Sequence, residues 1–240
     1  MKTFHSILAT SLVALAPTAV QADILQTHAG AEVSGGGVGL TIIDTNNDTN
    51  DWMDGYGDVG FSGTLYYSFV MEANSFSAPG NNASGSFGGL QLWHEGGERF
   101  LVGNNWGAAA WSAAGSTSGD YDLNSANPAD GQVWEFIEFD DPTQILVRID
   151  FAANGDDTVT VWLDPVNGAN EASQPAALTT TRLADTPFDA VHLRAGNDAT
   201  SYSYSNIVFA TTFAEANGVP EPGSLALLGL GGLALLRRRR

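Results

Sequence analysis

The sequence predicts an all-β fold, an antiparallel β-sandwich or jelly roll, because three of its features favour short paired strands. Apolar and polar residues alternate with a period of two in several runs, and no segment before residue 219 shows a long helical period. Gly-, Asn- and Ser-rich turns separate these runs. One turn, Asn154-Gly155, stands between two alternating runs, which is the strongest short-range signal for a β-hairpin.

The alternating runs define the expected strands. The turn Glu95-Gly96-Gly97-Glu98 joins two of them into a second hairpin. Leu65, Tyr67, Phe69 and Met71 share one face of their run and are expected in the core. Segments 81–86 and 112–120 are rich in Gly, Ser and Asn or Ala and are expected to be long loops. The expected strands are 38–43, 64–73, 89–93, 99–103, 144–151, 158–163, 188–193 and 204–210.

The first 22 residues have the three parts of a secretory signal peptide. Lys2 precedes an apolar stretch, Ile7 to Ala16, and the small residues Val20 and Ala22 favour cleavage after Ala22. We therefore expect signal peptidase to process the chain and the chain to be exported through the inner membrane.

The last 22 residues combine a Pro-Glu-Pro turn, an apolar run and an arginine cluster. The run, Leu225 to Leu236, would be about 18 Å long as a helix. The hydrocarbon core of a bilayer is about 30 Å thick, so this hydrophobic helix predicts only transient membrane association. The cluster is expected to stop the run at the cytoplasmic side, and it consists of Arg237, Arg238, Arg239 and Arg240. The chain thus divides into a signal peptide (1–22), a body (23–218) and a tail (219–240).

The tail resembles the PEP-CTERM sorting signal of Gram-negative, often biofilm-forming bacteria. The motif Val219, Pro220, Glu221 and Pro222, the apolar run and the terminal arginines carry this resemblance over the full length of the signal. It implies one partner, the exosortase-type membrane protease that removes the segment near the Pro-Glu-Pro. It also implies delivery to the cell envelope surface or the extracellular matrix after the tail is processed.

The body is strongly acidic and contains no cysteine. Loss of both ends takes Lys2 and the four terminal arginines but only one acid, Glu221, so the formal net charge changes from −18 to −22. Such a body is expected to avoid nucleic acid and anionic lipid headgroups and to attract cations such as Ca²⁺. Without disulfides, its stability must come from a core, and its length is sufficient to build one.

Calcium is the one cofactor that the sequence suggests, although none is required. Asp44, Asn46 and Asp48 place oxygen ligands at alternate positions, like the first half of an EF-hand loop. Thr49 and Gly55 stand where that loop needs glycine and glutamate, which excludes a regular EF-hand but leaves an irregular site open. The alternative is a solvated polar loop. A second and weaker calcium candidate comprises Asp156, Asp157 and Asp164.

A glycan-binding surface is expected around two tryptophans. Trp106 and Trp111 stand in Gly- and Ala-rich surroundings rather than on a clean strand, which favours their exposure. Exposed rings can stack on sugars, and Asn104 and Asn105 would supply hydrogen bonds. Trp93 is a further candidate for this platform. The alternative is that these aromatic residues belong to the core.

No complete catalytic set is visible. Glu138 and Asp140 would share one face of a strand and Glu135 the other, so the third carboxylate of many jelly-roll glucanases is missing. The histidines lack zinc-ligand spacing, and there is no Gly-x-Ser-x-Gly elbow. The sequence therefore predicts that the chain is not an enzyme.

The body resembles the concanavalin A-like, laminin G-like jelly-roll domains of exported bacterial proteins. The resemblance rests on Arg148-Ile149-Asp150-Phe151, on 154–165 and on 188–197. This sandwich hosts lectins, glucanases and adhesion modules, so the resemblance implies the fold more than an activity. The expected function is non-catalytic adhesion at the surface or in the biofilm matrix, through extracellular glycans or cations. The alternative is a secreted glycoside hydrolase or polysaccharide lyase that uses Glu138 and Asp140.

Overall fold

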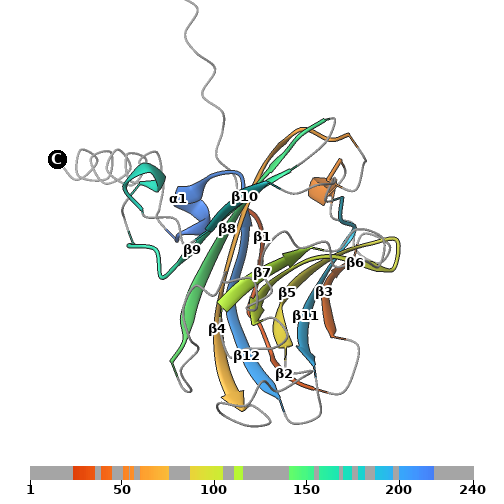
Figure 1. Ribbon diagram of the computed structural model, residues 1–240, viewed down its shortest axis with the longest axis vertical. Coiled ribbons are helices and arrows are strands. Elements are labelled where there is room, and N and C mark those ends of the chain that lie inside the picture. Colours follow the sequence, from red (N-terminus) through yellow and green to blue (C-terminus); the bar gives the residue numbers. More distant parts are fainter. Residues whose placement is uncertain are drawn as a thin grey trace, which may run out of the picture.

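The structure is a computed structural model, in which the two ends of the chain, residues 1–22 and 219–240, lie outside the described residues. The described chain forms two antiparallel β-sheets that pack face to face (Figure 1). The described residues are 24–35, 39–44, 51–53, 55–56, 60–75, 87–104, 111–115, 141–153, 157–167, 170–174, 178–181, 187–196 and 200–218.

Sheet A has the strand order β1-β12-β4-β8-β9-β10, and β2 also pairs with β12. Its strands are β1 (Ile24–His28), β2 (Glu32–Ser34), β4 (Gly63–Ser75), β8 (Thr143–Phe151), β9 (Thr158–Leu163), β10 (Leu178–Thr181) and β12 (Ser201–Ala210). Sheet B has the order β3-β11-β5-β6-β7. Its strands are β3 (Leu40–Asp44), β5 (Phe87–His94), β6 (Gly97–Asn104), β7 (Trp111–Gly115) and β11 (Ala190–Gly196). Short helical turns complete the described chain: η1 (Asp51–Met53), η3 (Glu171–Ser173) and α1 (Phe213–Ala216).

The predicted antiparallel β-sandwich is confirmed, and every expected strand overlaps an observed one. One loop prediction is wrong in part, because β7 along the edge of sheet B includes residues 112–115 of the expected loop 112–120. The rest of that loop and the expected loop 81–86 lie outside the described residues. Ser112, Ala113 and Ala114 of β7 are too small and uniform to show an apolar alternation. Pairing with β6 therefore determines this strand, not a local preference.

The hairpin between β5 and β6 closes through a two-residue turn. Glu95 and Gly96 both have positive φ values, 50° and 73°. Two consecutive residues of positive φ make a type I′ turn, whose twist matches that of the flanking strands. The register of β5 against β6 shifts once after this turn, between Trp93 and Leu92, and Gln91 then pairs with Leu101.

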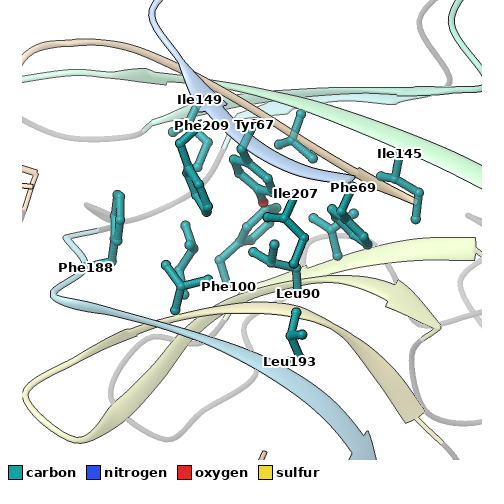
Figure 2. Close-up of a cluster of buried hydrophobic side chains, with 14 of the residues drawn as sticks. Tyr67, Phe69, Leu90, Phe100, Ile145, Ile149, Phe188, Leu193, Ile207 and Phe209 are labelled. Carbon is teal, nitrogen blue, oxygen red and sulfur yellow. The ribbon is translucent and has the colours of Figure 1, made fainter. Parts of the chain in front are cut away.

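The core is a layer of apolar side chains between the two sheets (Figure 2). Leu65, Tyr67, Phe69 and Met71 of β4 alternate into this layer and are fully buried, as their spacing predicts. Leu90 and Phe100 from β5 and β6, with others, close the layer from sheet B. Burial of each such side chain stabilises the fold by about 1.5–3 kcal/mol.

Two tyrosine hydroxyls lie inside this layer, one with a hydrogen-bond partner and one without. The Tyr202 hydroxyl accepts a hydrogen bond from Asn104 Nδ2 at 2.7 Å. The Tyr67 hydroxyl, which points into the core in Figure 2, has no hydrogen-bond partner among the described residues. Burial raises the pKa of Tyr67 well above its ordinary value, so this hydroxyl stays protonated and unsatisfied.

Replacing the two tyrosines by phenylalanine should therefore have unequal effects. Tyr67→Phe should leave the free energy of unfolding unchanged or raise it, because it removes an unsatisfied buried hydroxyl. Tyr202→Phe should lower it by about 1–3 kcal/mol, because it leaves the buried Asn104 amide without its acceptor. Urea denaturation of the body (residues 23–218) measures both changes, and an equal loss in the two variants would contradict this account of the core.

Candidate functional site

The outer face of sheet B, which points away from the core, carries polar and aromatic side chains. Val191 and Leu193 of β11 and Leu90 and Leu92 of β5 point into the core. Successive side chains of a strand point to opposite faces, so the residues between them point outward. His192 and Gln91 face each other directly across β11 and β5. The group that shares this face, here named the polar cluster, comprises Gln91, Trp93, His192 and Arg194.

Trp93 holds the polar cluster together. Its indole ring stacks on the His192 imidazole with ring centroids 4.7 Å apart and planes 13° apart. Its Nε1 donates a hydrogen bond to Gln91 Oε1 at 2.5 Å. The Arg194 guanidinium lies 5.9 Å from the centre of the same indole and 5.5 Å from that of Phe87. A cation at these distances is attracted by the negative faces of the rings.

Three buried nitrogen atoms of the polar cluster have no hydrogen-bond partner among the described residues. They are Gln91 Nε2, His192 Nδ1 and Arg194 Nε. Gln91 is fully buried and His192 is 8% exposed, so water satisfies these side chains poorly. Buried polar groups in folded proteins are almost always paired, and a group of unpaired ones calls for an explanation. The arrangement suits a ligand that offers oxygen acceptors.

The electrostatics of the polar cluster favour a neutral histidine beside a cation. Burial lowers the pKa of His192 from its ordinary value, and the Arg194 charge lowers it further. Asp44 and Asp189 act in the opposite direction but are the smaller influences. His192 is therefore neutral at neutral pH and can accept a proton, whereas Arg194 keeps its positive charge.

The two positions that follow Arg194 in its cross-strand row are both glycines. Gly89 lies opposite Arg194, and Gly103 lies opposite Gly89 on β6. A Cβ atom built at Gly89 would lie 2.2 Å from the Val102 carbonyl oxygen, so a larger residue cannot stand there. The backbone of the sheet is therefore bare of side chains at these two positions, next to the guanidinium.

Among the residues of the expected glycan platform, only Trp93, in the polar cluster, and Asn104 have side chains that the structure describes. Asn104 is buried inside the sandwich, where it donates to Tyr202, and it therefore belongs to the core and not to a sugar-binding surface. Trp111 begins β7, and nothing is described of its side chain. Trp106 and Asn105 lie outside the described residues.

The expected calcium ligands are only partly described. Asp44 ends β3 and pairs with Ala190, which in turn pairs with Trp93, so Asp44 lies in the same cross-strand row as the polar cluster. Asn46 and Asp48 lie outside the described residues. Within the part of the chain that is described, no group of three or more His, Cys, Asp or Glu side chains converges to hold a metal.

The second calcium candidate is divided by a strand. Asp157 accepts a hydrogen bond from the Ala152 amide at one end of β9, and Asp164 accepts one from the Gln144 amide at the other end. Both side chains therefore stabilise turns. Asp156 lies outside the described residues. So do Glu138 and Asp140, the two carboxylates expected to act if the chain is a hydrolase or lyase.

Sequence reasoning missed the polar cluster because it looked for spacing within single segments. Gln91 and His192 are about one hundred residues apart in the sequence. His192 has no second histidine at a metal-ligand spacing. The available signal was the alternation of 190–195, which places His192 and Arg194 on the face opposite Val191 and Leu193. Only the pairing of β5 with β11 brings Gln91 to them.

The body is thus a jelly-roll β-sandwich with a polar cluster on the outer face of one sheet. Residues 218–240 match the model of the PEP-CTERM protein-sorting motif, which confirms the sorting signal identified in the sequence. The chain is therefore an exported exosortase substrate that is sorted to the cell surface or the extracellular space. None of the helices in the described part of the chain has the length and apolar character needed to cross a membrane.

The chain is similar to several solved structures of carbohydrate-active enzymes. The endo-β-1,4-glucuronan lyase of the fungus Trichoderma reesei has 10% sequence identity and a TM-score of 0.45, over 64% of this chain and 71% of that chain. The catalytic domain of a glycoside hydrolase family 131 protein of Coprinopsis cinerea has 11% identity and a TM-score of 0.37, over 66% and 62%. A carbohydrate esterase of the Shiga toxin-encoding bacteriophage phi24B has 11% identity and a TM-score of 0.41, over 80% and 100%.

These similarities contradict the prediction that the chain is not an enzyme, because the similar structures are a lyase, a glycoside hydrolase and an esterase. That prediction relied on the absence of three patterns: the glucanase carboxylate set, zinc-ligand spacing of the histidines and a Gly-x-Ser-x-Gly elbow. Their absence excludes these classes of enzyme and not the reactions that other residues support. At 10–11% identity no residue role carries over to this chain. No curated protein sequence matches it significantly.

Replacing His192 should reduce the pH dependence of stability. The pKa of His192 is lower in the folded chain than in the unfolded chain. As the pH falls below about 6.5, His192 therefore takes up a proton in the unfolded chain but not in the folded chain. The contribution of this residue to stability is therefore complete above that pH and is lost as the pH falls towards the folded-state pKa. Urea denaturation of the body at about pH 7.5 and about pH 5.5 should show a smaller loss for His192→Gln than for the unmodified sequence.

A His28→Gln variant controls for the removal of a histidine as such, because His28 lies on β1 of the other sheet. An equal loss of stability with pH in the unmodified body and in His192→Gln would contradict the burial of a neutral imidazole in the polar cluster.

Proposed function

We propose that this exported, surface-sorted jelly-roll protein binds a carboxylate-bearing polysaccharide on the outer face of sheet B. The observation that carries this proposal is the set of three buried and unpaired nitrogen atoms on Gln91, His192 and Arg194. Arg194 is half-buried, so its guanidinium is the donor of the polar cluster that a sugar carboxylate can approach from the surface. Hydrogen bonds to a charged group contribute about 1.5–3 kcal/mol each, more than those between neutral groups.

The charge of the body supports an anionic ligand at this particular position. The body repels anions in general, since its formal net charge is strongly negative. Arg194 is one of its few basic residues, and two aromatic rings hold its guanidinium close to the bare glycine positions of the sheet. A polyuronate could therefore bind where its carboxylates reach this cation, and a neutral glucan would gain no such contact.

Binding should consequently depend on Arg194 and on the charge of the polysaccharide. Arg194→Ala should weaken the affinity of the body for alginate or polygalacturonate about tenfold or more, since every 1.4 kcal/mol is a factor of about ten. Dextran should bind weakly to both forms. Isothermal titration calorimetry measures these affinities.

Arg148→Gln is the matched control, because it removes the same charge from the opposite sheet, where Arg148 pairs with Glu171 at 2.7 Å. Circular dichroism checks that each variant is folded. Unchanged polyuronate binding by Arg194→Ala, or equal weakening by Arg148→Gln, would contradict a carboxylate site at the polar cluster.

A second candidate function, cleavage of the bound polyuronate by β-elimination, is favoured by the neutral state of His192. A neutral imidazole could remove the proton from the carbon next to the uronate carboxylate. The electron pair left behind would form a double bond to the neighbouring carbon, whose bond to the glycosidic oxygen breaks. The leaving oxygen takes up a proton. Arg194 and Gln91 would stabilise the negative charge that develops on the carboxylate.

Each cleavage leaves an unsaturated sugar at the new non-reducing end, and this sugar absorbs ultraviolet light. We expect absorbance to rise when the body is incubated with its preferred polyuronate, and the rise to disappear in His192→Ala but not in His28→Ala. A constant absorbance with every polyuronate that binds would contradict the elimination and leave the binding proposal standing.

We also propose, from the oxygen-rich sequence of 44–51, that calcium binds beside this face through Asp44, Asn46 and Asp48. Calcium should then raise the melting temperature of the body, with about 2.7 kcal/mol of stabilisation at 100 times the dissociation constant. Thermal melts with EDTA and with millimolar calcium measure this effect. The double variant Asp44→Asn, Asp48→Asn should abolish the calcium-dependent shift in melting temperature. Asp141→Asn, which changes an exposed aspartate elsewhere, should keep the shift. No shift in the unmodified body would contradict the calcium site.

A further inference from the structure

The folded body ends with a helical turn that is fixed to the outer face of sheet A. Phe213 of α1 is buried between Trp162 and Tyr66, with ring centroids 5.2 Å and 6.4 Å away in edge-to-face arrangements. Ser68 Oγ donates a hydrogen bond to the Ala216 carbonyl oxygen at 2.5 Å. These contacts hold α1 against β4 and β12.

The attachment continues to the last described residue. Asn217 is almost fully buried, and its Nδ2 donates to the Val166 carbonyl oxygen at 3.2 Å. The Gly218 amide donates to the Glu215 carbonyl oxygen at 3.1 Å. The chain is therefore held by the fold up to the residue that immediately precedes the motif Val219-Pro220-Glu221-Pro222.

This short separation limits how far a processing enzyme can stay from the body. A fully extended chain spans at most about 3.3–3.6 Å per residue, so Pro222 lies within about 14 Å of Gly218. The apolar run begins at Leu225, which is at most about 25 Å away. A membrane protease that cuts near the Pro-Glu-Pro must therefore place its active site beside α1.

The surface next to α1 is rigid and carries an exposed apolar side chain. Gln174 holds both backbone groups of Val166, since its Oε1 accepts from Val166 N at 2.9 Å and its Nε2 donates to Val166 O at 2.8 Å. The Val166 side chain is nevertheless 65% exposed. Among the described residues, Ile24 and Leu40 are the other large apolar side chains with comparable exposure. Ile24 pairs with Ala210, three residues before α1, whereas Leu40 lies on β3 of sheet B.

The carboxylates of this region are directed to protein partners. Glu171 of η3 accepts hydrogen bonds from Arg148 at 2.7 Å and from the Tyr66 hydroxyl at 2.8 Å. Glu215 is buried, and its carboxylate accepts a hydrogen bond from Thr212 Oγ1 at 3.2 Å. The body as a whole is strongly negative, but the carboxylates of this region are already paired. A protein can therefore approach this region with little electrostatic repulsion.

We propose that the exit face, formed by Val166, Gln174, α1 and Asn217, is the surface that the exosortase-type protease contacts while it processes the tail. The sandwich then contributes to substrate recognition and is more than passive cargo. Val166 supplies a fixed apolar contact, and the docked α1 presents the motif at a constant distance from it. The inference rests on the sorting motif and is independent of what the polar cluster binds.

The test follows the processing of the full chain in a host that carries its own exosortase. Val166→Asp should slow conversion of the precursor to the shorter form by about fivefold or more in a pulse-chase experiment. Leu40→Asp is the matched control, because Leu40 is also exposed, at 46%, but lies on β3 of sheet B. It should be processed at the rate of the unmodified chain. Equal melting temperatures of the purified chains exclude an effect on folding.

A flexible linker distinguishes contact with the protease from an indirect effect. Twelve Gly and Ser residues inserted between Gly218 and Val219 add a root-mean-square distance of about 20 Å, which releases the body from the enzyme. In this background Val166→Asp should no longer change the rate of processing. Processing of Val166→Asp at the unmodified rate, or equal slowing with the linker present, would overturn the proposal. So would Val166-dependent binding of the body to phosphatidylethanolamine–phosphatidylglycerol vesicles, which would assign the exit face to the bilayer.

Discussion

The layer of apolar side chains between the two sheets holds every other feature of this protein in position. Without cysteine, the body has no covalent constraint, and the sheets stay together because Leu65, Phe69 and their partners from sheet B leave water. This burial also fixes the strand registers, since a shift by one residue would turn each core side chain outward. The orientation of the polar cluster on one outer face and of Tyr66 on the other follows from these registers.

The two outer faces differ in how their arginines are paired, although sheet A also keeps one buried atom without a partner in the described chain, Trp162 Nε1. On sheet A, Arg148 lies between Glu171 and Asp150 at 2.7–2.8 Å, so its charge is used within the fold. On sheet B, His192 and Arg194 keep buried nitrogen atoms without a partner in the described chain. Unpaired buried groups reduce stability, and their persistence is most simply explained when a ligand completes them. The contrast separates a structural face from a face suited to recognition.

The sorting tail and the body are coupled more closely than a modular description of the chain implies. The tail is a short segment with its own signal, yet α1 and Asn217 bind the chain to the sandwich directly before it. The body is therefore held within about 25 Å of the start of the apolar run until the tail is removed. Once the tail is removed, the contacts of Phe213 remain with the body, so processing leaves the fold intact.

The sequence by itself determined the compartment, the strand periodicity and the sorting signal, because each depends only on residues that are contiguous in the chain. Period-two alternation predicted β4, β8 and β9, and the Pro-Glu-Pro with its apolar run predicted export and processing. It did not predict β7, whose small residues become a strand through pairing with β6. Only the tertiary structure decided the polar cluster, the burial of Asn104 and the docking of α1. These features depend on contacts between residues far apart in the chain, and the pairing of strands that creates such contacts leaves no local pattern.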